Sequence, residues 1–114
     1  MTKELENIAT DAVFDSSGSV FADLNLPHSE EDMLKMEIAR AIAATVRKRK
    51  LTQTEAATII GTDQAKLSAL LRGRLKDFSV DRLIRYLVLL GRNIDIRISG
   101  SSAGRGRVKV SQAA

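Results

Sequence analysis

The sequence of 114 residues has no cysteine, no tryptophan and a single histidine, His28. Without cysteine, the chain cannot form a disulfide scaffold, use a thiol as nucleophile or hold zinc through thiolates. A lone histidine also excludes histidine-pair metal sites and leaves no histidine-based catalytic pattern. No apolar run approaches the ~20 residues of a membrane-spanning helix, and the N-terminus lacks the apolar core of a signal peptide. We therefore expect a cytoplasmic protein that is not an enzyme and uses no metal or other cofactor.

Aromatic side chains are also scarce, so aliphatic side chains must fill most of a core. Apolar residues make up 44% and charged residues 28% of the sequence, which is an ordinary balance for a globular chain. The length fits one domain. The aromatic residues are Phe14, Phe21, Phe78 and Tyr86.

Positive charge is scarce in the first part of the chain and abundant in the second. Residues 1–46 contain three basic and nine acidic residues, a net charge of −6, whereas residues 47–114 contain fifteen basic and five acidic residues, a net charge of +10. A polyanion-binding surface on one side of the molecule would explain this asymmetry. The alternative is that the charged faces are only solvated, because charge alone does not name a partner.

Apolar periodicity predicts a mainly α protein. The first helix is expected to open at Ser29 as N-cap and to run to about residue 50, with acidic residues in its first turn. Its apolar stripe recurs at four-residue steps. The members of that stripe are Leu34, Ile38, Ile42 and Val46.

Three shorter helices are expected to follow. Thr52 and Glu55 form a T-x-x-E capping box, which predicts a helix that ends at Gly61. A third helix is expected from Thr62 or Asp63 to Gly73. A fourth is expected from the N-cap Ser79 to Gly91, with nearly continuous apolar residues between them.

Apolar and polar residues alternate over residues 93–99, which predicts a C-terminal β-strand. They alternate again over residues 107–110, where a second strand could form. A strand edge without a partner favours pairing with a second copy across a two-fold axis. We therefore expect a homodimer with contacts at Leu90, Ile94, Ile96 and Ile98. These patterns divide the chain into an N-terminal arm (1–28, partly extended or mobile), a helical domain (29–92) and a strand with tail (93–114).

The second and third helices meet at Gly61 with almost no linker, which is the geometry of a helix-turn-helix. In that motif, the second helix enters the major groove of DNA and its N-terminal residues reach base edges. Glutamine and lysine side chains can recognise adenine and guanine, and alanine can contact the thymine methyl group. We predict base contacts by Gln64, Ala65, Lys66 and Ala69.

Phosphate contacts are expected around this reading helix. The N-terminus of the preceding helix attracts phosphate through its amides and its dipole, and basic residues follow the reading helix. We predict phosphate contacts by Thr52, Gln53, Ser68, Arg72, Arg74 and Lys76. Many helical hairpins do not bind DNA, and the basic surroundings are what favour DNA here.

Two strings of this motif, residues 52–61 (TQTEAATIIG) and 67–73 (LSALLRG), resemble the XRE (Cro/C1-type) helix-turn-helix family. More narrowly, the chain resembles the HigA-type antitoxins. The strings that carry this narrower resemblance are residues 17–24 (SGSVFADL), 70–74 (LLRGR), 78–83 (FSVDRL) and 89–96 (LLGRNIDI).

The resemblance implies a compact lambda-repressor-like domain of four to five helices. It also implies a dimeric repressor that binds an inverted repeat in its own operator as double-stranded DNA and often neutralises a RelE/HigB-like toxin. Such a toxin is expected to dock on the acidic N-terminal part, where Phe21, Leu24 and Leu26 are candidate apolar anchors. The alternatives are a regulator without a toxin and a protein-interaction module whose helix-turn-helix is only structural.

Overall fold

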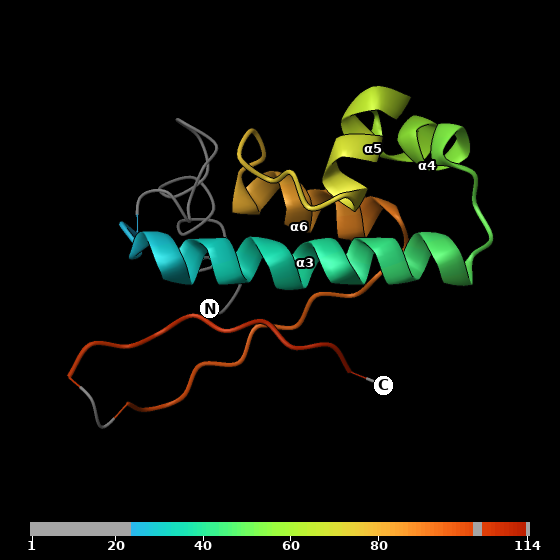
Figure 1. Cartoon of the computed structure of the whole chain (residues 1–114). Helices are drawn as coiled ribbons and strands as arrows, with labels where there is room; N and C mark the ends of the chain where they lie inside the picture. Colours follow the sequence, from blue (N-terminus) through green and yellow to red (C-terminus); the bar gives the residue numbers. More distant parts are fainter. Residues whose placement is uncertain (1–23, 102–103, 114) are drawn as a thin grey trace, which may run out of the picture.

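The structure, a computed structural model, describes residues 24–101 and 104–113, and four helices dominate these residues (Figure 1). Their bounds are α3 His28–Lys48, α4 Gln53–Ile60, α5 Gln64–Leu71 and α6 Val80–Leu89. The long α3 packs along α6, while α4 and α5 form a second layer beside the C-terminal half of α3 (Figure 1). A mainly α, helix-turn-helix fold is therefore confirmed. Most of the expected N-terminal arm, including Phe21, lies outside the described residues.

The three short helices begin at the side-chain caps that their sequences predict. The hydroxyl of Thr52 accepts a hydrogen bond from the amide of Glu55, and the Glu55 carboxylate accepts one from the amide of Thr52. Asp63 caps α5 and Ser79 caps α6 in the same way, each through one side-chain oxygen. Each cap satisfies an amide that would otherwise lack a partner in the first helical turn.

The predicted start of α3 is wrong by two residues and in its chemistry. The N-cap is Pro27 rather than Ser29, and no side chain caps this end. Proline fixes φ near the helical value, so the chain enters the helix directly after it, at His28. The carboxylate of Asp32 lies 3.3 Å from the imidazole of His28.

The core lies between α3, α6 and the α4–α5 pair and is almost entirely aliphatic, as the composition predicts. Ile42, Ala56, Leu67 and Leu83, one from each helix, are fully buried. The aromatic contribution is a single edge-to-face contact, in which the ring centroids of Phe78 and Tyr86 are 6.3 Å apart. This core fixes α5 against the long helix and so holds the helix-turn-helix in place.

The predicted C-terminal β-strand is wrong for the single chain. Residues 93–99 carry no strand in the described structure, and neither do residues 107–110. The two segments extend along the side of α3 that faces away from α4 and α5 (Figure 1). A period of two reports which side chains share a face, but a strand also needs a ladder partner, and the described residues supply none.

The residues expected at a dimer contact fall into two groups. Leu90 is buried in the core of its own chain, where it is 2% exposed. In contrast, Ile94, Ile96 and Ile98 are 38%, 81% and 92% exposed. The isoleucines therefore lie on the surface, whereas Leu90 does not.

Candidate nucleic-acid interface

The turn between α4 and α5 depends on Gly61. Its φ is +77°, a left-handed conformation that side-chain-bearing residues adopt at a cost. This ends α4, and the amide of Thr62 donates to the carbonyl of Ala57 at 2.9 Å. Because Ala57 and its neighbour Ala56 are small and buried, the two helices can pack closely. The result is a helix-turn-helix.

The helical periodicity of α5 separates a buried side from a solvent side. Leu67 and Leu70 are 0% and 1% exposed and face the core. Opposite them lies a solvent-facing group that includes four of the predicted contact residues. These residues are the exposed Ala65 and Arg72 and the half-buried Ser68 and Ala69. The exposed Gln64 and Lys66 lie on the two flanks of this side.

The side chains of Gln53 and Gln64 are joined by a hydrogen bond. The Nε2 atom of Gln64 donates to the Oε1 atom of Gln53 at 2.8 Å, and both side chains are exposed. This bond links the first residue of α4 to the first residue of α5. It restricts the rotamers of Gln64 and leaves its Oε1 atom to accept from a base. Gln53 therefore lies where it can orient the predicted base-reading residue.

A second side-chain pair lies along the solvent side of α5. The guanidinium of Arg72 donates to the hydroxyl of Ser68 at 2.9 Å. The two residues are one helical turn apart, so this bond holds the guanidinium along the helix. The other donors of the guanidinium remain directed to solvent. The bond thus joins two of the residues that were predicted to contact phosphate.

The N-terminus of α4 is partly occupied by its own capping box. Hydrogen bonds from the backbone and the hydroxyl of Thr52 hold the pKa of Glu55 below its ordinary value of 4.5. The carboxylate thus remains ionised and engages the amide of Thr52. Within the described residues, the amides of Gln53 and Thr54 have no partner, so a phosphate at this end would bind there. The hydroxyl of Thr52, which was predicted to contact phosphate, is itself engaged by Glu55 in this capping box.

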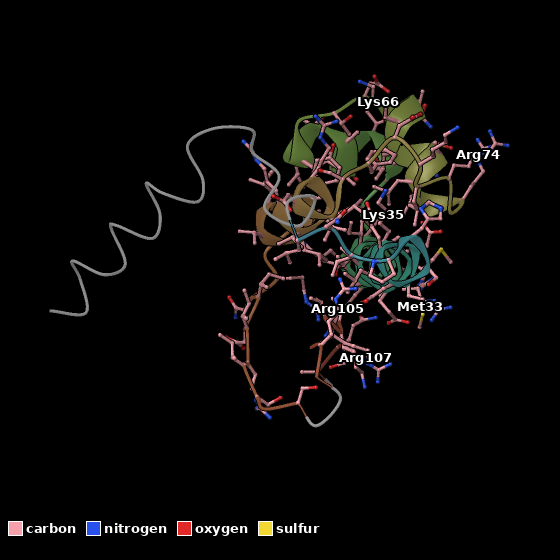
Figure 2. The ribbon with its side chains drawn as sticks, turned by 90° about the vertical axis from the view of Figure 1, so that its left-hand side faces the viewer. Met33, Lys35, Lys66, Arg74, Arg105 and Arg107 are labelled. Atoms are coloured by element: carbon pink, nitrogen blue, oxygen red, sulfur yellow. The ribbon has the colours of Figure 1, made fainter. Side chains whose placement is uncertain are left out.

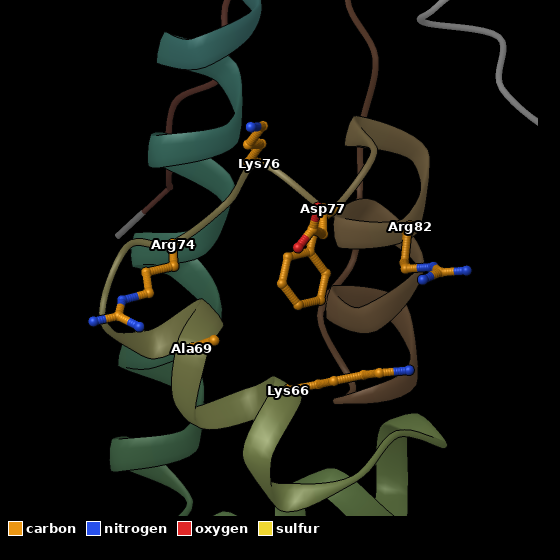
Figure 3. Close-up of a pocket in the computed structure, with 7 residues that line it drawn as sticks. Lys66, Ala69, Arg74, Lys76, Asp77 and Arg82 are labelled. Atoms are coloured by element: carbon orange, nitrogen blue, oxygen red, sulfur yellow. The ribbon is translucent and has the colours of Figure 1, made fainter.

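A basic hollow of about 390 Å³ opens between α5 and the start of α6 (Figure 3). Lys66 reaches across it from α5 toward α6, and Ala69 lines the α5 side (Figure 3). Four cationic side chains and one carboxylate surround it, so the net charge of its rim is positive. The charged residues are Lys66, Arg74, Lys76, Arg82 and Asp77.

The cations of this region have no carboxylate partners among the residues that the structure describes. The three ion pairs found there all lie within α3: His28 with Asp32, Glu31 with Lys35, and Glu37 with Arg40. Lys66 and Arg74 lie at the opposite end of the molecule from Arg105 and Arg107 (Figure 2). A polyanion at the α5 surface would therefore meet cations that form no ion pair within the described residues.

Two comparisons with known proteins agree with this geometry. A family-wide sequence profile for a helix-turn-helix domain matches residues 20–99. A solved structure described as an XRE family transcriptional regulator superimposes with a TM-score of 0.67 at 34% sequence identity. The match covers 77% of this chain and 99% of that chain.

The chain belongs to the XRE family of helix-turn-helix regulators. Among curated proteins, none matches the sequence. No helix in residues 24–101 and 104–113 is long and apolar enough to cross a membrane. In the same residues, no group of three or more histidine, cysteine or acidic side chains is placed to hold a metal ion.

The XRE domain of this chain brings together two features that sequence reasoning missed. Arg82 joins the rim of the basic hollow from α6, although it is 13 or more positions from the reading residues. Its position three residues after the N-cap Ser79 was a usable signal, because a first-turn residue of α6 lies near the preceding loop. The Gln53–Gln64 bond had no such signal, since it depends on the angle between α4 and α5.

Proposed function

We propose that this XRE regulator is a sequence-specific repressor that places α5 in the major groove of double-stranded DNA. The observation that carries the proposal is the Gln64 amide, held at 2.8 Å by Gln53 at the front of a helix that unpaired cations surround. A glutamine positioned in this way can recognise adenine. The cations supply the affinity that is independent of sequence.

In this proposal the solvent side of α5 divides its roles by position. Gln64, Ala65, Lys66 and Ala69 face base edges. The phosphate contacts come from both ends of α5 and from the start of α4, and Arg82 joins them from α6. These phosphate-binding residues are Thr52, Gln53, Ser68, Arg72, Arg74, Lys76 and Arg82.

The repressor is proposed to act as a homodimer on an inverted repeat. A two-fold protein presents one α5 to each half-site, and the half-sites then lie about one helical turn apart, ~34–36 Å. A repeat with altered spacing should bind more weakly than the correct one, because only one α5 would then reach its bases.

A pair of arginine variants tests the phosphate assignment. Arg74→Ala should weaken binding to cognate and scrambled duplexes alike and reduce the slope of log affinity against log salt by about one unit per site. Arg107→Ala removes the same charge at the opposite end of the molecule (Figure 2) and should leave the slope unchanged. The measurement is fluorescence anisotropy over a salt series. Equal effects of the two variants would contradict the proposal.

A narrower proposal is that the repressor is the antitoxin of a RelE/HigB-like ribonuclease encoded beside it. Its support is the resemblance to HigA-type sequences together with the charge of α3. The N-terminal half of α3 is acidic and presents two exposed methionines, Met33 and Met36, 70% and 41% exposed. Acidic and apolar groups together suit a basic protein partner.

The docking surface can be tested apart from DNA binding. Asp32→Lys with Met33→Asp should abolish capture of the neighbouring gene product while leaving affinity for the operator unchanged. The matched control is Lys66→Asp, which should weaken operator binding and spare capture. If the first variant still captures the toxin at full yield, this surface is not where the toxin binds.

A further inference from the structure

Large aliphatic side chains gather on the surface at the junction of α6 and the C-terminal segment. Val88 and Leu89 are 54% and 44% exposed at the end of α6, and Ile94, Ile96 and Ile98 are 38%, 81% and 92% exposed in the segment that follows. So many exposed large apolar side chains in a short stretch of a small domain point to an interaction surface. The question is which partner covers them.

The backbone of the same segment is also without partners. Within the described part of the chain, residues 93–100 make no hydrogen bond to any other segment. The following segment does not serve as an internal ladder strand. The amide of Val108 donates to the carboxylate of Glu30 at 2.8 Å, and Val108 and Val110 pack against the helical core.

The sequence of this segment is complementary to itself. If two copies run antiparallel with Ile96 opposite Ile96, then Ile94 lies opposite Ile98 on one face. On the other face, Asp95 of each copy lies opposite Arg97 of the other, which gives two pairs of opposite charge. We propose that residues 93–99 of two copies form an antiparallel two-stranded ladder centred on Ile96.

Neighbouring registers are much less favourable. Centring the pair on Asp95 places the two aspartates opposite each other, and centring it on Arg97 places the two arginines opposite each other. Like charges directly across a ladder are destabilising. A register centred between two neighbouring residues would place each isoleucine opposite a charged residue, so that neither face would be purely apolar. The isoleucine face and the charge face therefore select the same register.

This inference rests on the proposed dimeric repressor and assigns its contact surface. The ladder would lie on the side of α3 away from α4 and α5, so pairing would leave the reading helices accessible (Figure 1). The three isoleucines of each copy would gain burial, and every second amide along each strand would gain an acceptor on the partner.

Charge reversal gives the sharpest test of the register. Asp95→Arg creates arginine–arginine pairs in the dimer and Arg97→Asp creates aspartate–aspartate pairs, so each should weaken dimerisation about tenfold or more. The double variant Asp95→Arg with Arg97→Asp restores opposite charges and should recover the wild-type dimer. Mixing the two single variants should yield heterodimers, since every cross-strand pair is then of opposite charge.

The measurements are sedimentation equilibrium over a concentration series and native mass spectrometry of the mixture. Arg74→Asp, on the α5 side, is the matched control and should leave the dimer unchanged. Ile96→Asp should give a monomer, and circular dichroism checks that its helices persist. A double variant as weak as the single ones, a mixture without heterodimers, or a dimer unaffected by Ile96→Asp would each overturn the inference.

Binding of the wild-type protein to a single half-site separates this inference from the proposed function. If the protein stays monomeric yet binds the half-site specifically, the ladder and the homodimer are wrong, while the proposal that α5 reads DNA stands. If the ladder forms but no duplex binds specifically, the repressor proposal fails while the ladder remains.

Discussion

Leu67 and Leu70 in α5 are 0% and 1% exposed, whereas Ile96 and Ile98 in the C-terminal segment are 81% and 92% exposed. Both pairs come from strongly apolar patterns, one with a helical period and the other with a period of two. The helix-turn-helix region buries its pattern within one chain. The C-terminal segment presents its pattern to solvent, and burial there would require a second chain.

The same two regions differ in how their backbone groups are satisfied. Each short helix carries an N-cap in its own sequence, so its hydrogen bonds close locally. Residues 93–100 have no such device, so water satisfies their exposed amides and carbonyls, and a neighbouring strand would replace that water. The comparison teaches that one region specifies its structure alone, while the other would become regular only with a partner, as in the proposed ladder.

The largest expected effect comes from comparing a buried leucine of the helix-turn-helix with an exposed isoleucine of the C-terminal segment. Leu67→Ala should lower the free energy of unfolding by about 2–5 kcal/mol, because it leaves a cavity beneath α5. Ile98→Ala in a monomeric background such as Ile96→Asp should change it by less than about 0.5 kcal/mol, since that side chain is already in solvent. Urea denaturation measures both. Equal losses would mean that the C-terminal segment belongs to the core of the single chain.

The next effect concerns the interface on the helix-turn-helix side. Gln64→Ala should cost about 1–3 kcal/mol on the cognate site and relax preference at one position in each half-site. Gln53→Ala should cost less, because it removes a positioning bond and one phosphate contact.

A double-mutant cycle decides whether the two glutamines act together. If Gln53 orients Gln64, the double variant should lose less affinity than the sum of the single losses. Anisotropy with cognate and scrambled duplexes at matched salt supplies the four affinities. Additive losses would show that the bond between the glutamines does not matter in the complex, and equal losses on both duplexes would show that α5 is not the reader.

A glycine substitution in each region tests backbone specification. Gly61→Ala forces a side chain into a left-handed conformation at φ +77°, which should lower stability by about 1 kcal/mol. Gly106→Ala, in the C-terminal segment, has open space around it and no positive φ, so it should be nearly neutral. Thermal unfolding of the two variants provides the comparison, and an equally tolerant Gly61 would mean that the turn between α4 and α5 is not rigid.

Much of the fold could be predicted because its signals are local. Several of these signals act within four residues of sequence. They are the capping box of Thr52 and Glu55, the glycine at position 61 and the N-cap Ser79. The wrong cap at Ser29 shows the limit of such signals, because Pro27 started the helix earlier by fixing one backbone angle. Local chemistry predicted the helices well and their first residues less reliably.

The remaining features depend on distant neighbours. Alternation in residues 93–99 predicted a strand, but no partner strand exists in the described chain, so the prediction was wrong there. The basic hollow needed Arg82 from α6, and the Gln53–Gln64 bond needed the angle between two helices. Sequence reasoning could locate the helix-turn-helix, but it could not assign partners to the side chains of α5.

The smallest expected effect is electrostatic and belongs to the cap of α4. Because Thr52 lowers the pKa of Glu55, the ionised carboxylate contributes stability above the pKa of the unfolded chain, near 4.5, and that contribution is lost as the pH falls through the lower folded value. Glu55→Gln keeps both cap hydrogen bonds without the titration. Thermal midpoints from neutral pH down to about pH 3 should therefore fall more steeply for the wild type than for the variant. Parallel curves would mean that solvent screens this fully exposed carboxylate and that only its hydrogen bonds hold the start of the helix-turn-helix.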